Sequence, residues 1–411
     1  MLKNFFLKWA FLLLILAFNL IIGIKTGIGF FYFFFWLLLA IIGISFSWLI
    51  AGYFSLKLSL ERQLQHKTEE GGCIEVEAKI ESKGFLPIFN LLLEDIFSCV
   101  VGSEGKKWIF LEYLLSAYPL RLKYSFTCPQ RGKFRVGPIA AYFFDPFCLF
   151  FLKKTFPLYA EIFVFPKTFR VKKFPLLIKG AMPWFGIQAA HTSGDEDEFY
   201  GVREYKEGDP IKRIHWLSSA RKSCLVVKQF QRQSFFRATL MFNLEKDKNF
   251  GEGEDSACEY MVKIAASVAK YLLENDVALE VHAQAQEAVS ILSNKGSEHL
   301  EDILKFLAVA QAESRVSLGE VFEQSLRHIA DNTILIVIML DKDWRHLAQL
   351  LPLEKRNISL VPLILVSSSF VYEFDKQEFS KDVKITLSKE FNFKPILFSR
   401  GDDLEGVFLN A

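Results

Sequence analysis

Two long apolar runs open the chain. The run from Phe5 to Ile24 is broken only by Lys8, and the run from Gly27 to Tyr53 contains no charged residue. Each run reaches the roughly 20 residues that a membrane-spanning helix needs. Because residues 23–27 read as a minimal turn where the two runs meet, we expect a transmembrane helical hairpin over residues 1–55.

Cations flank this predicted hairpin unequally. Only Lys25 lies in the turn, whereas the outer flanks carry Lys3, Lys8, Lys57, Arg62 and Lys67. The positive-inside rule therefore predicts a two-span protein of the cell inner membrane with both termini in the cytoplasm. A cleaved signal peptide is the alternative, but no small-residue cleavage pattern follows the first run.

Short segments with alternating apolar and polar residues follow, between residues 68 and 166. Cys73–Ile80 and Leu120–Phe126 alternate with period two, which is typical of strands with one solvated face. Pairs that favour sharp reversals separate the segments, namely Lys83-Gly84, Arg131-Gly132, Gly137-Pro138 and Asp145-Pro146. We expect a β-sandwich-like region here.

The last part of the chain, residues 237–411, alternates strand and helix patterns. Apolar strands are predicted at residues 238–244, 277–283, 333–340 and 359–366, and helices at 255–274 and 298–310. A capping box at Ser317 and Glu320 opens a third helix, which should run to about residue 330. The order predicts an α/β domain with an open sheet covered by helices.

A charged stretch lies between these regions, within a linker and signature segment over residues 167–236. Residues 171–191 read as a connection and residues 194–198 as a solvated acidic loop. Asp209 before Pro210 predicts an N-capped helix over residues 211–220, with Ile211, Ile214, Leu217 and Trp216 inward and Ser219 outward. A strand should follow at residues 224–230.

Three interpretations of this stretch compete. A hydrolase could use Glu204, Asp209 and His215 as acid and base groups, but no nucleophile, metal spacing or phosphate loop accompanies them. Nucleic-acid binding is disfavoured, because neighbouring acids nearly cancel the local lysines and arginines and the whole chain carries a net charge of only +2. We favour a structural role, in which Arg203, Arg213 and Arg221 pair with the acids and His215 packs or caps a helix.

Composition supports the membrane prediction and adds little chemistry. Hydrophobic residues make up 51% of the chain and aromatic residues 15%, which is high for a soluble protein. The six cysteines are scattered without a C-x-x-C pair, so we expect buried thiols in a reducing compartment and no zinc site.

Several separated motifs resemble the bacterial domain-of-unknown-function 58 family. They are GVREY at 201–205, GD at 208–209, RIHW at 213–216, SAR at 219–221 and VK at 227–228, after the RG, GP and DPF steps of the β-rich region. The resemblance marks as signature residues Arg203, Glu204, Tyr205, Gly208, Asp209, Arg213, His215, Trp216, Ala220, Arg221 and Lys228.

This resemblance also implies a von Willebrand factor type A-like fold for residues 237–411. Such domains often hold Mg²⁺ through an Asp-x-Ser-x-Ser motif and a later Asp, because a hard ion prefers carboxylate and hydroxyl oxygens. The matching positions here are Asn243, Glu245 and Asp247, with Lys246 between them, and only Asp341 follows the pattern. We therefore expect a degenerate site and no metal or other cofactor.

The function that these features favour is a non-enzymatic scaffold anchored in the lipid bilayer. The family resemblance implies a MoxR-type AAA+ ATPase as the cytoplasmic partner of the von Willebrand-like domain, in envelope or stress-related assembly. The hydrolase using Glu204, Asp209 and His215 is the alternative.

Overall fold

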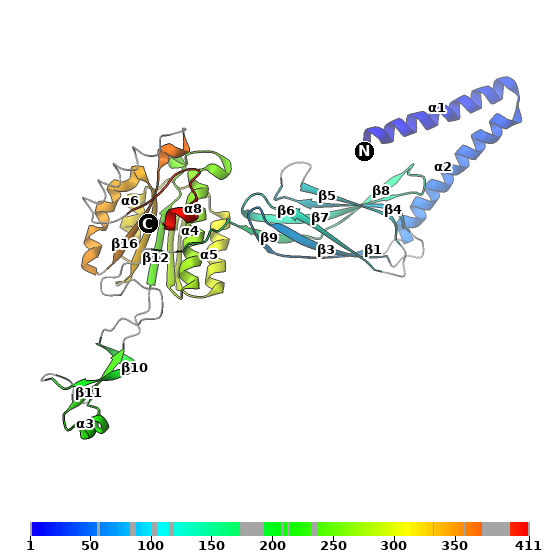
Figure 1. Cartoon of the computed structure of the whole chain (residues 1–411). Helices are drawn as coiled ribbons and strands as arrows, with labels where there is room; N and C mark the ends of the chain where they lie inside the picture. The colour runs from blue at the N-terminus through cyan, green and yellow to red at the C-terminus, as the bar shows by residue number, and fades with distance from the viewer. Residues whose placement is uncertain are drawn as a thin grey trace. The chain divides into compact units, whose positions relative to one another are not determined.

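A computed structural model describes most of the chain. It covers residues 2–55, 58–82, 88–100, 105–114, 119–172, 174, 193–206, 209, 211, 214–231, 237–331, 333–356, 358–371 and 395–409. The chain divides into two compact units, Met1–Phe165 and Pro166–Ala411. Helices and strands of both units are labelled in Figure 1.

Helices α1 (Leu2–Thr26) and α2 (Gly29–Ser55) form the start of the first unit. Their spans Leu7–Thr26 and Gly29–Ala51 are long and apolar enough to cross a membrane. Only 11% of an 18-residue stretch in each span is buried. Large apolar side chains such as Phe11 and Phe18 are exposed along them, which distinguishes them from the core helices of a soluble protein. The predicted turn at residues 23–27 is wrong by a few residues, because α1 continues through Gly23 and the chain reverses at Gly27, whose φ is +68°.

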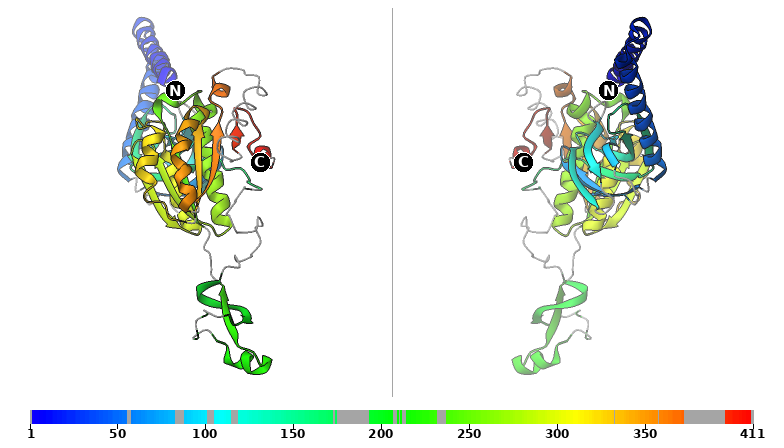
Figure 2. Two further views of the ribbon diagram at one scale, coloured as in Figure 1. Left: turned by 90° about the vertical axis from the view of Figure 1, so that its left-hand side faces the viewer. Right: turned by 90° about the vertical axis from the view of Figure 1, so that its right-hand side faces the viewer.

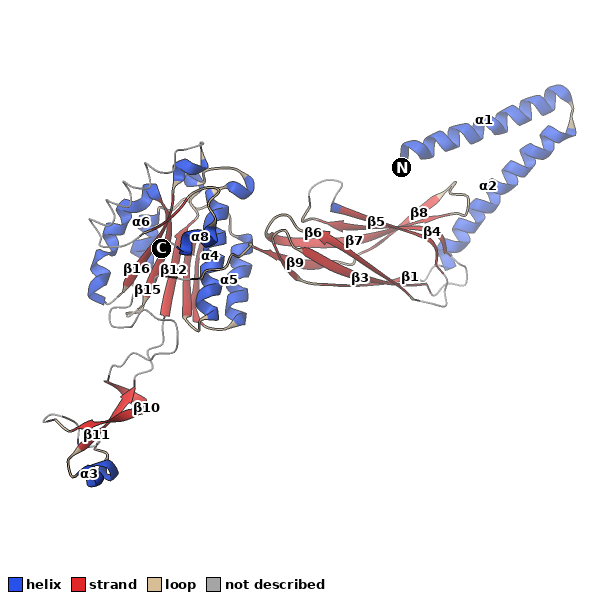
Figure 3. Ribbon diagram, in the orientation of Figure 1, coloured by secondary structure: helices blue, strands red, loops and turns tan. Residues whose placement is uncertain are grey.

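Strands build most of what the structure describes of the rest of the first unit, as Figure 3 shows. One sheet has the order β1-β3-β6, from β1 (Leu58–Leu64), β3 (Cys73–Ser82) and β6 (Leu120–Thr127). The other has the order β2-β9-β7-β4-β5, from β2 (Lys67–Glu69), β9 (Ala160–Phe165), β7 (Gly132–Phe144), β4 (Ile88–Phe97) and β5 (Lys106–Leu114), and β8 (Phe151–Phe156) pairs with β7. Buried clusters draw side chains from both sheets, such as Leu60 and Ile80 with Leu91 and Ile139, so the two sheets share a core.

Two details of this region differ from the sequence prediction. Strand β1 begins at Leu58, ten residues before the predicted boundary, and it pairs with β3 along its whole length. Gly137-Pro138 lies inside β7 rather than in a turn, beside an irregularity in the β4–β7 register. A Cβ at Gly137 would lie 2.0 Å from the Leu158 carbonyl oxygen, so close backbone approach requires glycine there. Asp145-Pro146 does form a turn.

The helical hairpin contacts this β-rich region at the Asp145 turn. The Trp9 indole N–H donates to the Leu149 carbonyl at 3.0 Å, and the Ser45 hydroxyl donates to the Asp145 carboxylate at 2.5 Å. Asp145 is fully buried and also accepts from the backbone N–H groups of Phe147 and Phe150. The turn predicted from Asp145-Pro146 therefore also joins the helices to the strands.

A six-stranded sheet forms the centre of the second unit. Its order is β14-β13-β12-β15-β16-β17, from β14 (Ala288–Asn294), β13 (Ala278–Gln284), β12 (Arg237–Asn243), β15 (Ile334–Leu340), β16 (Ser359–Leu365) and β17 (Ile396–Phe398). All neighbours are parallel except the β13–β14 pair. Strands β12, β13, β15 and β16 match the predicted ones to within about a residue, whereas β14 and β17 were not predicted.

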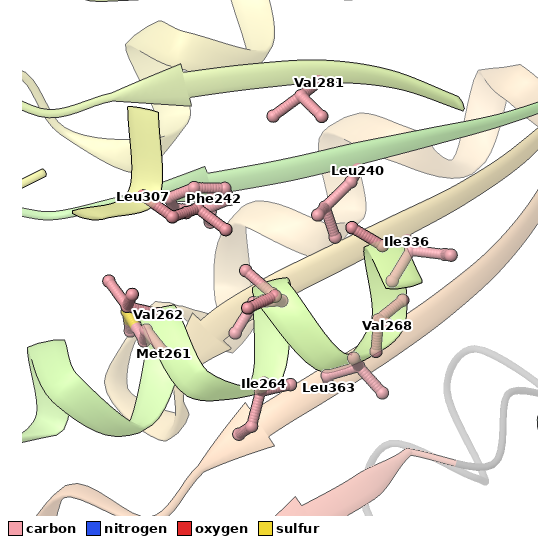
Figure 4. Packing of buried hydrophobic residues seen from close by; sticks show 14 of the residues in the cluster. Leu240, Phe242, Met261, Val262, Ile264, Val268, Val281, Leu307, Ile336 and Leu363 are labelled. Carbon is pink, nitrogen blue, oxygen red and sulfur yellow. The ribbon is translucent and has the colours of Figure 1, made fainter. Parts of the chain in front are cut away.

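Helices cover both faces of this sheet. Helices α4 (Ala257–Glu274), α5 (Ser297–Val309) and α8 (Leu404–Leu409) share one core with the strands, and Figure 4 shows α4 side chains such as Ile264 and Val268 packed against Leu240 and Ile336. Helix α6 (Leu318–Ser325) and the 3₁₀ segment η5 (Asp341–Arg356) pack on the other face. The hydroxyl of Ser317 accepts from the Glu320 N–H and donates to the Glu320 carboxylate, so Ser317 is the predicted N-cap, although α6 ends at Ser325 rather than near residue 330.

Strands β10 (Ser193–Glu204) and β11 (Val226–Gln231) pair antiparallel, with the short helix α3 (Trp216–Lys222) between them in sequence. We call these three elements the signature hairpin, and Figure 2 shows α3 at one end of the strand pair. The acidic run at residues 194–198 belongs to β10, so it is a strand and not the predicted loop. Of the predicted connection at residues 171–191, only 171, 172 and 174 are described, and Val171 and Phe174 pack into the α/β core.

Candidate functional site

A bidentate ion pair closes the turn that follows β10. Both guanidinium nitrogens of Arg203 donate to the Asp209 carboxylate, at 2.7 and 2.6 Å, and the Lys206 N–H donates to the same carboxylate at 2.9 Å. The hydrogen bond from Arg203 is the main cause that holds the pKa of Asp209 below its usual value, and the Lys206 N–H adds to it. Asp209 therefore keeps its charge and pins the loop.

Helix α3 begins later than the sequence predicts. Its N-cap is His215, whose Nδ1 accepts from the Ser218 N–H, and the helix starts at Trp216 instead of residue 211. Asp209 does not cap it, because the helix starts seven residues later and the Asp209 carboxylate accepts from Arg203 and from the Lys206 N–H. His215 thus takes the capping role that its sequence context favoured.

The burial of this helix also differs from the prediction. Ser219 is buried, and its hydroxyl donates to the His215 carbonyl and accepts from the Val226 N–H, so it ties α3 to β11. Ile214 is buried as predicted, but Ile211, Trp216 and Leu217 are 69%, 65% and 64% exposed. The signature hairpin therefore presents apolar side chains to solvent, and Leu225 adds another that is 46% exposed.

The remaining signature residues take varied positions. Glu204, Ala220 and Arg221 are exposed, whereas Tyr205 and Lys228 are half-buried. Gly208 and Arg213 lie outside the described residues. Of the three predicted ion pairs between an arginine and an acid, the described residues contain that of Arg203 with Asp209. No observation on Glu204, Asp209 and His215 favours the hydrolase interpretation, since Asp209 is engaged by Arg203 and His215 caps α3.

A second group of polar residues lies at the carboxyl edge of the α/β sheet. If the six strands are numbered as they occur along the chain, their order across the sheet is 3-2-1-4-5-6. The direction of winding reverses between β12 and β15. Ligands of doubly wound sheets bind at this reversal, outside the carboxyl ends of the strands. The loops after β12 and β15 bring Asn243, Glu245, Lys248 and Asp343 to this point, and we call these four residues the edge cluster.

Lys248 lies at the centre of the edge cluster. Its ammonium is 2.8 Å from a Glu245 carboxylate oxygen and 2.7 Å from an Asp343 carboxylate oxygen. Burial alone would lower the pKa of Lys248, but the hydrogen bonds and charges of Asp343 and Glu245 outweigh it and raise that pKa. Lys248 is therefore a cation held between two acids that come from adjacent loops.

Asn243 completes the cluster from the end of β12. Its side-chain nitrogen donates to the Val316 carbonyl at 2.7 Å, and the side chain is only 7% exposed. The amide oxygen Oδ1 has no hydrogen-bond partner among the described residues. Asn243, Glu245, Lys248 and Asp343 line a cavity of about 10 Å³, together with apolar residues such as Met261.

The degenerate site predicted from sequence is only partly assembled. Asn243 and Glu245 belong to it, but Asp247 is exposed. Asp341 accepts from the backbone N–H groups of Lys342 and Ser367, and Asp343 supplies the carboxylate that meets Lys248. Sequence reasoning missed Lys248 and Asp343, although two acids directly after a buried strand could have indicated Asp343.

Comparison with known proteins gives one family and distant relatives. The model of the family described as "Protein of unknown function DUF58" matches residues 201–361. "Uncharacterized protein YeaD" of Bacillus subtilis (strain 168) is 27% identical over 154 residues, which cover 36% of this chain and 36% of that protein. The match thus spans about a third of that relative's length.

Solved structures show weak similarity only. The CARDB domain of the PF1109 protein from Pyrococcus furiosus, solved in complex with di-metal ions, has a TM-score of 0.18 and 15% identity, over 26% of this chain and 88% of that chain. Spo0M, the sporulation control protein of Bacillus subtilis, has a TM-score of 0.16 and 13% identity, over 26% of this chain and 49% of that chain.

Proposed function

Since the chain belongs to DUF58, a family of proteins of unknown function, we propose a role from its own residues. The chain is a membrane-anchored, non-enzymatic scaffold that presents a von Willebrand factor A-like domain, together with the signature hairpin that precedes it in sequence, to a protein partner. The partner class that the family resemblance implies is a MoxR-type AAA+ ATPase. The exposed apolar surface of the signature hairpin is the observation that carries this proposal.

That surface has the composition of a binding site for a protein. Ile211, Trp216, Leu217 and Leu225 are all exposed, although water contact with such side chains is unfavourable. Tryptophan is enriched among the residues that dominate interface energetics. The Arg203–Asp209 pair and the His215 cap hold the helix and loop in place, so the surface is preorganised before the partner arrives.

The sheet supports a von Willebrand-like assignment of the second unit. The 3-2-1-4-5-6 order, with helices on both faces and the antiparallel strand β14 at one edge, is that of a doubly wound domain. The edge cluster bears on the expected cofactor. The Lys248 ammonium between Glu245 and Asp343 repels a divalent ion, so the proposed scaffold uses no Mg²⁺.

Membrane anchoring follows from the two exposed apolar helices. Spans of 20 and 23 residues are long enough to cross the hydrocarbon core. The cations at both outer flanks and the single Lys25 near the turn favour cytoplasmic termini, which would place both units beside a cytoplasmic ATPase.

Co-purification tests the proposal. Tagged full-length chain is captured from detergent-solubilised membranes with a slowly hydrolysed ATP analogue, and the MoxR-type ATPase of the same genome is detected by antibody. The wild type should retain the ATPase, Trp216→Ala should lose most of it, and Lys222→Ala at the exposed end of the same helix should not. Failure of the wild type to retain any ATPase would sink the partner assignment.

A further inference from the structure

The edge cluster lies where a doubly wound sheet binds its ligand, and its centre is already filled by a side chain. The loop after β12 contributes Glu245 and Lys248, and the loop after β15 contributes Asp343. These loops flank the reversal of the winding, so the cluster lies at the position that the topology favours for a bound group.

The oxygen atoms of the cluster form the kind of set that binds a hard cation. Asn243, Glu245 and Asp343 line one small cavity, and the buried amide oxygen of Asn243 has no hydrogen-bond partner in the described part of the chain. A buried amide oxygen without a donor costs free energy, and a cation beside it would satisfy it. Oxygen ligands of this type bind Ca²⁺, Mg²⁺ and Mn²⁺ at about 2.0–2.6 Å.

The ammonium of Lys248 meets the same carboxylates at only slightly longer range. Its distances of 2.7 and 2.8 Å exceed metal–oxygen distances by roughly 0.5 Å. A divalent ion and the ammonium therefore need the same space. Because Asp343 is only 6% exposed, it needs a nearby cation to be stable as a carboxylate.

We infer that the Lys248 ammonium is a built-in substitute for a divalent cation at the switch point of the sheet. The residues do not fit a bound metal while Lys248 stands there, because its charge and volume exclude one. The edge is consequently assembled at any divalent-ion concentration. This inference stands on the geometry of the cluster and is independent of the ATPase partner.

Removing the ammonium should create a metal site. In Lys248→Ala the two carboxylates and the Asn243 oxygen remain, and space opens for an ion with its water. Mn²⁺ is the probe, measured by the loss of its free-ion electron paramagnetic resonance signal with the full-length chain in nonionic detergent. We expect one Mn²⁺ per chain with a dissociation constant of about 1 mM or lower, the weak end of oxygen-ligand sites.

Matched variants separate this site from general charge effects. Lys246→Ala removes the same charge from an exposed position two residues away and should gain no saturable binding. Lys248→Ala with Asp343→Asn should lose the gained site. Mn²⁺ should raise the Tm of Lys248→Ala and leave the wild-type Tm unchanged.

Two results would overturn the inference. One is saturable Mn²⁺ binding by the wild type, and the other is a folded Lys248→Ala chain that binds no more Mn²⁺ than Lys246→Ala. If Lys248→Ala does not fold, Lys248→Ser replaces it, because its short hydroxyl removes the charge, leaves the space open and adds a polar group to the site. The wild-type titration tests the exclusion of metal without any variant.

Discussion

Replacement of Arg62 by methionine should destabilise the β-rich region strongly. Arg62 donates to Asp95 at 2.9 Å and to the carbonyls of Val136 and Leu158 at 3.1 and 3.0 Å. The side chains of Arg62 and Asp95 are 3% and 2% exposed, so this is a buried ion pair that links the two sheets. Methionine fills a similar volume but leaves the Asp95 carboxylate buried without its cation.

The magnitude follows from this burial. Removing one partner of a buried pair costs about 3–5 kcal/mol, because the other charge stays desolvated. For a region of this size, each kcal/mol lowers the Tm by about 2–4 °C, so the expected loss at pH 7 is about 6–20 °C. The control is Arg121→Met on β6, where an exposed arginine lies 3.7 Å from Glu77 and the loss should be below about 1 kcal/mol.

The pH dependence gives the second half of this prediction. Burial raises the pKa of Asp95 above its ordinary value of 3.8, and this outweighs the lowering by Arg62 and by the Tyr124 hydroxyl. Because its folded-state pKa is raised, Asp95 makes its full contribution to stability below pH 3.8. That contribution is lost as the pH rises through the folded-state pKa. Without Arg62 this pKa rises further, so the defect of Arg62→Met should shrink as the solution is acidified.

Scanning calorimetry of the full-length chain in nonionic detergent at pH 7 and pH 5 measures both effects. The reasoning about the buried pair would be refuted if Arg62→Met and Arg121→Met differed in Tm by less than about 2 °C at pH 7. It would also fail if acidification widened the gap between them.

Three further predictions address other parts of the chain. Asp209→Asn should loosen the signature hairpin, which faster amide hydrogen exchange would show. Because Arg203 lowers the pKa of Asp209, the wild-type hairpin has its full stabilisation above the unfolded-state pKa of Asp209 and loses it as the pH falls through the folded-state pKa. Gly137→Ala should destabilise the β-rich region by more than about 1 kcal/mol, since φ is +101° and Cβ meets the Leu158 carbonyl, as a denaturant titration would register. A protease added outside right-side-out vesicles should leave both units intact and cut them in inverted vesicles; the opposite pattern would reverse the proposed topology.

Strong periodic patterns carried most of the fold prediction. The apolar runs gave α1 and α2, and the continuous apolar segments of the α/β unit gave β12, β13, β15 and β16, because burial on both faces demands such runs. Strand β14 was missed because its sequence, AVSILSN, has no continuous apolar run, and it lies mostly exposed at the edge of the sheet.

The candidate site could be predicted less well, for a physical reason. Local sequence suggested that Asp209 caps a helix, but Arg203 takes its carboxylate, and this competition depends on the pairing of β10 with β11. Likewise the second partner of Lys248 is fixed by the fold, because Glu245 is only three residues away in sequence but Asp343 is 95 residues away. Contacts between loops cannot be read from spacing within either loop.

The central claim is that the signature hairpin binds a MoxR-type ATPase, and the equilibrium affinity tests it most directly. Full-length chain in nanodiscs is titrated with the purified ATPase of the same genome, with Trp216→Ala and Lys222→Ala in parallel. The account predicts saturable binding by the wild type and by Lys222→Ala, and at least about a tenfold weakening by Trp216→Ala, as for the loss of an interface anchor. Absence of saturable binding by the wild type, or equal affinity for Trp216→Ala, would contradict it.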